Sequence, residues 1–245
     1  MKPAIKVLGV PDDINSSFMR GSSAAPHLIR EALYSASSNL FSESGLNLDQ
    51  KGIWEDLGDI EFAGEVAVEN FKKIKTFVKD VLVSDQKLVS LGGDHSVSWP
   101  ILDAHLDKWD ALDILHIDAH PDLYDSLLGN KLSHASPFAR IMETGRASRL
   151  VQVGIRTLNK HQREQAEKFG VEIYQMKDLT KLSSLSFSKP VYCSIDIDAL
   201  DPAYAPGVSH FEPGGLSTRQ LIDCLNGFKG RLIGADIVEY NPKRD

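Results

Sequence analysis

Residues 112–122 read Leu-Asp-Ile-Leu-His-Ile-Asp-Ala-His-Pro-Asp, and this stretch shows how the chain is organised. Its first part, Leu112–Ile117, is a short, largely apolar run of the kind that forms a strand buried on both faces of a sheet. Polar residues that can bind a ligand begin directly after it, at Asp118. Because ligands gather beyond the carboxyl ends of parallel strands, the stretch predicts both a central strand and part of a site.

Similar apolar runs recur along the chain, and segments with helical spacing lie between most of them. The other predicted strands are Ala4–Val10, Gly52–Leu57, Leu88–Leu91, Leu150–Ile155, Val171–Tyr174, Val191–Ile197 and Leu232–Val238. The predicted helices are Pro26–Ser37, Val66–Val83, Val97–Leu106, Pro137–Thr144, His161–Phe169 and Thr218–Phe228. This alternation predicts an α/β fold of three layers, α/β/α, in which a mostly parallel sheet of about eight strands carries helices on both faces.

The length and composition of the chain favour one domain. With 245 residues, of which 42% are hydrophobic and 25% charged, the chain is long enough for one large core. No linker, internal repeat or low-complexity tract interrupts it. We therefore expect residues 1–245 to form a single domain.

Charge and cysteine content argue against several classes of protein. The formal net charge of −7 and the absence of a Lys/Arg cluster argue against a nucleic-acid partner, and no run of about 18 apolar residues could span a membrane. The two cysteines, Cys193 and Cys224, are too few for a disulfide scaffold or a thiolate metal site. A strand-like run begins within three residues of the N-terminus, so we expect no targeting segment and a cytoplasmic location.

A glycine-rich turn follows the apolar run Leu88–Leu91. Residues 92–96 read Gly-Gly-Asp-His-Ser, and His95 is a candidate metal ligand. Asp and Ser after such a turn are also ordinary helix-capping residues. This segment alone therefore leaves both interpretations open.

The polar stretch after Ile117 gives a stronger signal. Asp118, His120 and Asp122 are spaced two residues apart, so they face one side of an extended backbone. Two carboxylates and an imidazole directed at one volume repel one another or resist desolvation unless a cation lies between them. A metal site is therefore favoured over a capping aspartate beside an unrelated histidine.

A third polar group closes the run Val191–Ile197. Asp196 and Asp198 share one face of the predicted strand end. An isolated Asp-x-Asp pair is a weak signal, because such pairs also hold nucleotide-bound metal in glycosyl transfer. Asp201, which precedes Pro202, is better explained as a turn residue or as support for a ligand than as a ligand itself.

Together, the three groups predict a centre for two divalent cations that is more specific than any of its parts. The candidate ligands are His95, Asp118, His120, Asp122, Asp196 and Asp198. Their four carboxylates neutralise two divalent ions, and oxygen-rich ligation with some imidazole suits manganese. Two such ions about 3.5–4 Å apart can share a water and lower its pKa toward neutrality.

Four segments of the chain match, in order and spacing, the signature blocks of the arginase/agmatinase ureohydrolases. They are Gly92–Ser96 (GGDHS), Asp118–Asp122 (DAHPD), Ser194–Pro202 (SIDIDALDP) and Gly234–Pro242 (GADIVEYNP). The chain most resembles the plant-type arginase branch, through Gly129–Glu143 (GNKLSHASPFARIME), Leu150–Arg156 (LVQVGIR) and Asp201–Ser217 (DPAYAPGVSHFEPGGLS). The resemblance extends over essentially the whole chain.

This resemblance implies an enzyme that hydrolyses the guanidino group of arginine or agmatine and releases urea. It implies two Mn²⁺ per chain, one held by His95, Asp122 and Asp118 and the other by His120, Asp196, Asp198 and Asp118. Asp118 and Asp198 are then the candidate bridging ligands. It further implies a small guanidino substrate and assembly as a homo-oligomer, a trimer or a hexamer.

Further site residues follow from the resemblance. His134 matches the family's active-site histidine, which passes protons to the departing amine, and Glu239 matches the acid that holds the guanidinium. We count Asp122 with these two as catalytic. Asn130 resembles the asparagine that arginases use on the substrate's α-carboxylate, and Ser133 is a second candidate contact.

Substrate choice stays open within the family. The loop after Arg156 reads Thr157-Leu158-Asn159-Lys160 and lacks the acidic residue with which animal-type arginases approach the α-amino group. Formiminoglutamate and guanidinobutyrate are therefore alternative substrates. The chain also stops at Asp245, where family members continue into a closing helix, so a catalytically silent binding or regulatory homologue is an alternative. The ligand types would also suit a dinuclear phosphoesterase, but the chain lacks the Asn-His-Asp block and the additional histidine ligands of that class.

Overall fold

A sheet of eight parallel strands forms the centre of the protein. The computed structural model describes residues 5–83, 86–179 and 185–245. The strands are β1 (Ile5–Val10), β2 (Trp54–Asp59), β3 (Lys87–Gly92), β4 (Leu112–Ile117), β5 (Ala147–Ile155), β6 (Glu172–Gln175), β7 (Ser186–Asp196) and β8 (Lys229–Val238). All eight predicted strands are thus confirmed, except that Ala4, the first residue of the first prediction, lies outside the described residues.

Helices follow most of the strands, as the helical spacing of the sequence predicts. Within the described ranges the α-helices are α1 (Ala25–Leu33), α2 (Ala67–Leu82), α3 (Ser98–Lys108), α4 (Pro137–Glu143), α5 (Lys160–Phe169) and α6 (Thr218–Gly227). Local caps fix several of their ends. The side chain of Asn159 accepts a hydrogen bond from Gln162 N at the start of α5, and Ser217 and Gln220 form a capping box at the start of α6.

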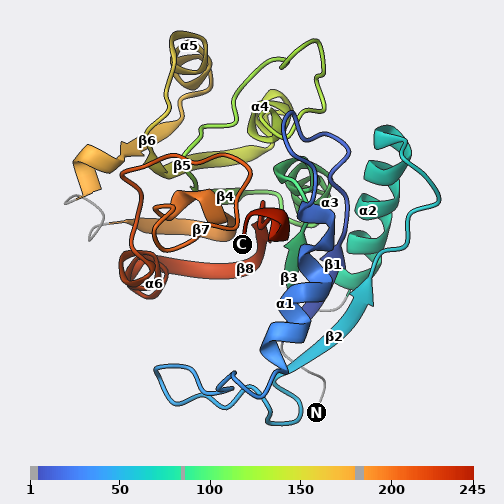
Figure 1. Cartoon of the computed structure of the whole chain (residues 1–245). Coiled ribbons are helices and arrows are strands. Elements are labelled where there is room, and N and C mark those ends of the chain that lie inside the picture. The colour runs from blue at the N-terminus through green and yellow to red at the C-terminus, as the bar shows by residue number, and fades with distance from the viewer. Residues whose placement is uncertain (1–4, 84–85, 180–184) are drawn as a thin grey trace.

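The strand order places four strand ends together. It is β2-β1-β3-β8-β7-β4-β5-β6, and each neighbouring pair is parallel. The central strands β3, β8, β7 and β4 therefore present their carboxyl ends at one edge (Figure 1). An α/β sheet binds ligands beyond this edge, and the predicted site residues follow these strands.

Each face of the sheet has its own apolar core. Ile114 of β4 packs in a core with Ile74 of α2 and Ile101 of α3, and all three side chains are fully buried. The next residue of β4, Leu115, points to the opposite face and packs in a second core with Leu221 of α6. The predicted three-layer architecture is confirmed, because helices cover both faces of the sheet.

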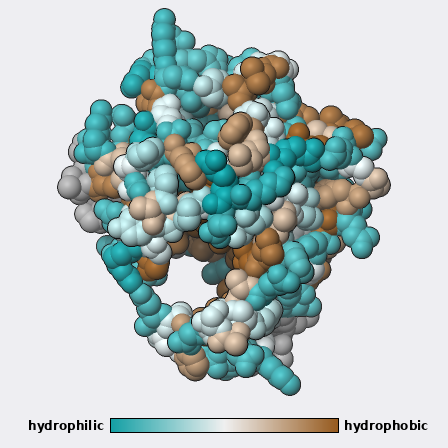
Figure 2. All heavy atoms as spheres, viewed as in Figure 1, coloured by the Kyte–Doolittle hydropathy of each residue, from teal (hydrophilic) through white to brown (hydrophobic). Residues whose placement is uncertain are grey.

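The surface is largely polar on the face seen in Figure 2, where hydrophobic side chains lie scattered among hydrophilic ones. The segment between α1 and β2 projects away from the sheet and leaves open space beside it (Figures 1 and 2). Among the described residues, the helices are all too short or too polar to cross a bilayer.

Candidate metal centre

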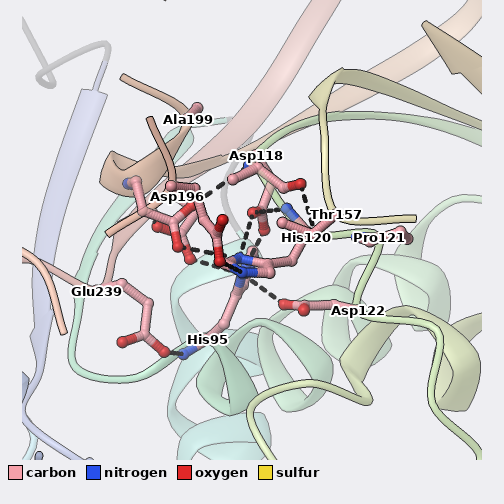
Figure 3. A network of polar contacts seen from close by, with 12 residues as sticks. His95, Asp118, His120, Pro121, Asp122, Thr157, Asp196, Ala199 and Glu239 are labelled. Carbon is pink, nitrogen blue, oxygen red and sulfur yellow. Dashed lines mark hydrogen bonds and ion pairs between the residues drawn. The ribbon is translucent and has the colours of Figure 1, made fainter. Parts of the chain in front are cut away.

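The carboxyl ends of the four central strands each supply part of one buried polar cluster. His95 lies just after β3, Asp118 just after β4, Asp196 at the last position of β7, and Glu239 just after β8. All four residues are buried. The convergence of the predicted residues is confirmed, and Figure 3 shows the side chains of the cluster directed toward one another.

Turns, rather than extended strand ends, bring the remaining candidates into the cluster. Asp122 has a φ of +51°, and Asp198 lies in the 3-10 turn Ile197–Ala199. The expectation that alternate residues share one side of an extended backbone was therefore wrong at both places, although the residues do converge. Asp122 and Glu239 (φ +66°) both adopt the left-handed region, which costs free energy for non-glycine residues and is common at functional sites.

His95 faces three carboxylates through one ring nitrogen. Its Nδ1 lies 3.1 Å from Asp118 Oδ2, 3.0 Å from Asp122 Oδ2 and 3.3 Å from Asp196 Oδ2. The side chain is buried, yet Nδ1 makes no hydrogen bond of acceptable geometry to any described residue. A buried polar atom in this position needs another partner.

The outer nitrogen of the same ring shows which partner Nδ1 needs. Ser194 donates to Asp236 Oδ1 at 2.6 Å, so Nε2 of His95, 3.0 Å from Ser194 Oγ, is the donor in that second contact. A neutral imidazole that donates through Nε2 presents the lone pair of Nδ1 to three carboxylates. This arrangement is repulsive unless a cation lies between the nitrogen and the oxygens, so these residues fit a metal ion.

His120 is arranged in the same way. Its Nδ1 lies 3.0 Å from Asp198 Oδ2 and 3.5 Å from Asp118 Oδ1, while Nε2 lies 3.3 Å from Glu212 Oε1. With Nε2–H donated to Glu212, the lone pair of Nδ1 again faces carboxylate oxygens. Asp118, His120 and Asp198 thus form a second group whose ligand atoms lie close enough to hold one ion.

His116, which the sequence analysis did not select, also lies beside the first group. Its Nε2 donates to Asp118 Oδ2 at 2.7 Å, and its Nδ1 accepts from Gln152 Nε2 at 3.0 Å. Burial lowers the pKa of His116 to about 4, so the ring is neutral. Because both nitrogens have partners, His116 is better explained as the residue that orients Asp118 than as a ligand.

The crowded carboxylates strongly perturb one another. Burial raises the pKa of Asp122 to about 6, with a further contribution from Asp118. Burial and the neighbouring Asp198 and Asp118 raise the pKa of Asp196 well above its usual range. Without a cation these groups hold protons at a pH where an exposed aspartate is ionised, and a bound cation takes the place of those protons.

His134 and Glu239 form an ion pair beside the carboxylate cluster. His134 Nδ1 lies 2.8 Å from Glu239 Oε1, which also accepts a hydrogen bond of 2.9 Å from the backbone N–H of His95. Burial opposes the charged form of His134, but Glu239 outweighs it and raises the histidine pKa to about 9. The other ring nitrogen, Nε2, lies 2.8 Å from the hydroxyl of Ser17, a residue that the sequence analysis missed.

A cavity of about 190 Å³ opens onto this cluster. It is lined by Ser17, His120, Asp122, Tyr124, Leu127, His134, Ala135, Thr157, Gln162, Asp196, Asp198, His210, Glu212 and Glu239. The cavity brings two groups together, the metal-binding carboxylates and the His134–Glu239 pair. A small cationic molecule can therefore contact both at once.

The two residues predicted to contact the far end of the substrate do not line this cavity. Asn130 is exposed, donates to Asn15 Oδ1 at 3.2 Å and accepts from the backbone N–H of Leu132 at 2.8 Å. Ser133 is buried and accepts from the backbone N–H of Ala135 at 3.3 Å. Substrate contact by either residue stays a prediction.

Comparisons with known proteins agree with the fold and point to one family. The chain is 47% identical to arginase 2, chloroplastic/mitochondrial, of Arabidopsis thaliana over all of this chain and 75% of that protein. It is 34% identical to an agmatinase of Bacillus cereus over 98% of this chain and 84% of that protein. The structure of an arginase from Medicago truncatula superposes with a TM-score of 0.94 at 45% identity, covering 99% of this chain and 81% of that one.

The Arabidopsis relative carries an organelle location in its name, so the comparison does not support the cytoplasmic location expected from the N-terminus, which stays a prediction. The model of the Arginase family matches residues 3–245. With the fold, the polar cluster and these relatives in agreement, the chain belongs to the arginase family and is a hydrolase that acts on linear amidines.

Proposed function

We propose that this protein is a manganese-dependent ureohydrolase that hydrolyses the guanidino group of arginine or agmatine and releases urea. The observation that supports this most directly is the placement of His95 Nδ1 and His120 Nδ1, each facing carboxylate oxygens while its outer nitrogen is hydrogen-bonded. The names of the relatives, arginase and agmatinase, favour these two substrates.

Two Mn²⁺ ions would be held by two imidazoles and four carboxylates, a donor set that suits this metal. The ligands would be His95, Asp118, His120, Asp122, Asp196 and Asp198. Asp118 has one oxygen near each histidine, which supports its expected bridging role. Asp196 Oδ2 lies 3.3 Å from His95 Nδ1, and Asp198 Oδ2 lies 3.0 Å from His120 Nδ1. The bridging role expected of Asp198 stays a prediction.

The reaction adds water to the guanidinium carbon and breaks the bond from that carbon to the alkyl-bearing nitrogen. When bound, the two ions would lower the pKa of a water molecule and so supply the nucleophile at neutral pH. Glu239 would bind and orient the planar guanidinium. Its Oε1 is already occupied by His95 N–H and His134, which leaves Oε2 for the substrate.

His134 would supply the proton that the departing amine needs. Its raised pKa of about 9 keeps the ring protonated at neutral pH. Nδ1 is held by Glu239, so Nε2, which now lies beside Ser17, is the nitrogen from which a proton would pass to the amine. Urea and a free amine then leave the site.

Three other functions would give different results in an activity assay. Guanidinobutyrate, which differs from agmatine at the end far from the guanidino group, or formiminoglutamate, which carries a formimino group in place of the guanidino group, would be hydrolysed at the same metal ligands. A catalytically silent homologue would keep the carboxylate cluster and bind a partner without turnover.

A parallel assay separates these outcomes. We expect the Mn-loaded protein to release urea from arginine or agmatine, with guanidinobutyrate as a third substrate and formamide or ammonia release from formiminoglutamate as a fourth. The Glu239→Gln variant should lose at least about 100-fold in kcat/KM, because it removes the charge that orients the guanidinium. A wild-type protein that takes up no Mn²⁺ and is inert on all four substrates would overturn the proposal.

A further inference from the structure

The cavity contains one more carboxylate than the proposed chemistry uses. Among the described lining residues, the acids are Asp122, Asp196, Asp198, Glu212 and Glu239, and there is no lysine or arginine. The three aspartates belong to the proposed metal centre, and Glu239 belongs to guanidinium binding. Glu212 is the acid that remains.

Glu212 is held in place but still has a free oxygen. Its Oε1 accepts from His120 Nε2 at 3.3 Å, and its backbone carbonyl accepts from Arg156 Nε at 2.8 Å. The other oxygen, Oε2, receives no hydrogen bond from the residues that the structure describes. The side chain is 33% exposed, so this oxygen can meet a ligand without the cost of full desolvation.

Arg156 holds the loop of Glu212 close to the candidate metal centre. Besides Glu212 O, the guanidinium of Arg156 donates to the backbone carbonyls of Asp198 (2.7 Å) and Ala199 (3.2 Å). These bonds tie the loop that carries Glu212 to the turn that carries Asp198.

Glu212 adds a carboxylate to a cavity that has no lysine or arginine among its described lining residues. The protonated His134 in the same cavity is already paired with Glu239. The free oxygen of Glu212 therefore favours a ligand with a cationic group at this end of the cavity.

We propose that Glu212 is a specificity-determining residue whose Oε2 binds the ammonium group at the end of the substrate far from the guanidino group. This inference rests on the proposed function. It narrows the substrates to guanidino compounds that carry a second, cationic amine, as agmatine and arginine do. Guanidinobutyrate, which has a carboxylate at that end, would be repelled by Glu212.

The Glu212→Gln variant tests this role, because a glutamine amide oxygen can still accept from His120 while the negative charge is lost. We expect KM for agmatine and for arginine to rise about 10- to 100-fold, the effect of losing a hydrogen bond to a charged group. KM for N-butylguanidine, whose far end is neutral, should not change, and KM for guanidinobutyrate should fall. The value of kcat and the Mn²⁺ content should stay within about twofold, since the bond to His120 is kept.

A matched control is Glu164→Gln on α5, which should change none of these values, because this exposed glutamate has its single ion pair within the described part of the chain with Lys160. Titration calorimetry of agmatine and N-butylguanidine measures the same preference without turnover. It therefore decides the role of Glu212 even if the wild-type protein releases no urea, a result that would overturn the proposed function alone. An equal loss of affinity for both compounds, or a loss of Mn²⁺ from Glu212→Gln, would show that Glu212 acts through His120 and would overturn the inference.

Discussion

Ser194 controls which nitrogen of His95 faces the carboxylates. It accepts from Nε2 of His95 and donates to Asp236, whose other oxygen accepts from the hydroxyl of Tyr192 at 2.8 Å. All of these residues are buried. Partners of this kind keep a histidine ligand in the tautomer and orientation that a metal ion requires.

The Ser194→Ala variant should therefore bind Mn²⁺ about 10- to 100-fold more weakly than the wild-type protein. The loss follows because Nε2 of His95 would keep no hydrogen-bond partner and the ring would be free to change tautomer or to turn. Equilibrium dialysis with metal analysis measures the effect. Ser90→Ala is the control, since Ser90 is a buried serine on β3 whose hydroxyl has no partner among the described residues. Equal Mn²⁺ affinity in the two variants would rule out this role for Ser194.

At the scale of single residues, the candidate metal ligands could be predicted from the sequence more easily than the residues that hydrogen-bond to them. His95, Asp118 and Asp196 follow apolar runs within motifs, so their convergence was predictable. Ser194 and Glu212 each contact a histidine that follows another strand, and these contacts depend on the order of the strands. Single-residue patterns do not contain that information.

At the scale of elements, strand positions were predictable and strand order was not. Runs such as Leu112–Ile117 have the composition of buried strands, so all eight appear in the sequence. The last strand, β8, lies between β7, which precedes it in the chain, and β3, which is more than 130 residues away in the sequence. Only the packing of the whole sheet decides that insertion, which brings Glu239 beside His95.

Gly93 is the point at which the ends of three strands meet. Glu239, which follows β8, donates its backbone N–H to Gly93 O at 2.8 Å. Asp94, the residue after Gly93, donates its backbone N–H at 3.0 Å to the carbonyl oxygen of Asp12, which follows β1. A Cβ atom at position 93 would lie 2.0 Å from Asp12 O. No side chain fits there unless the backbone moves.

We therefore expect Gly93→Ala to reduce the free energy of unfolding by roughly 1–3 kcal/mol, the usual cost of inserting an atom into a packed region. Urea denaturation followed by circular dichroism measures this change. Gly64→Ala is the control, because a Cβ there meets nothing within 4 Å, and its stability should be unchanged or slightly higher. If Gly93→Ala were as stable as Gly64→Ala, the close contact with Asp12 would not constrain the fold.

At the scale of the whole molecule, the buried acids make stability depend on what neutralises them. Asp122 and Asp196 have raised pKa values in the folded state, so the folded chain without metal binds more protons than the unfolded chain. A raised carboxyl pKa stabilises the fold at low pH, and this stability is lost as pH rises from the unfolded value near 3.8 through the folded value, about 6 for Asp122. The metal-free protein should therefore lose this contribution at neutral pH.

Bound Mn²⁺ should restore this stability. The effect should be largest at the pH at which the buried carboxyl groups no longer hold protons in the metal-free protein. A free concentration of 100 times Kd adds about 2.7 kcal/mol per site, which raises the unfolding temperature of a chain of this length by about 5–10 °C. We expect the difference in unfolding temperature between Mn-loaded and chelator-treated protein to be largest near pH 8. This difference should shrink as pH falls toward 6, because Asp122, Asp196 and His95 must release protons to bind the ions. The pKa of His95 is also raised, since its three carboxylate neighbours outweigh its burial.

Differential scanning calorimetry over this pH range measures the difference. The control is Asp196→Asn, in which the effect of Mn²⁺ on the unfolding temperature should be smaller. An unfolding temperature at pH 8 that does not respond to Mn²⁺ would mean that the six side chains hold their protons and do not form a metal centre.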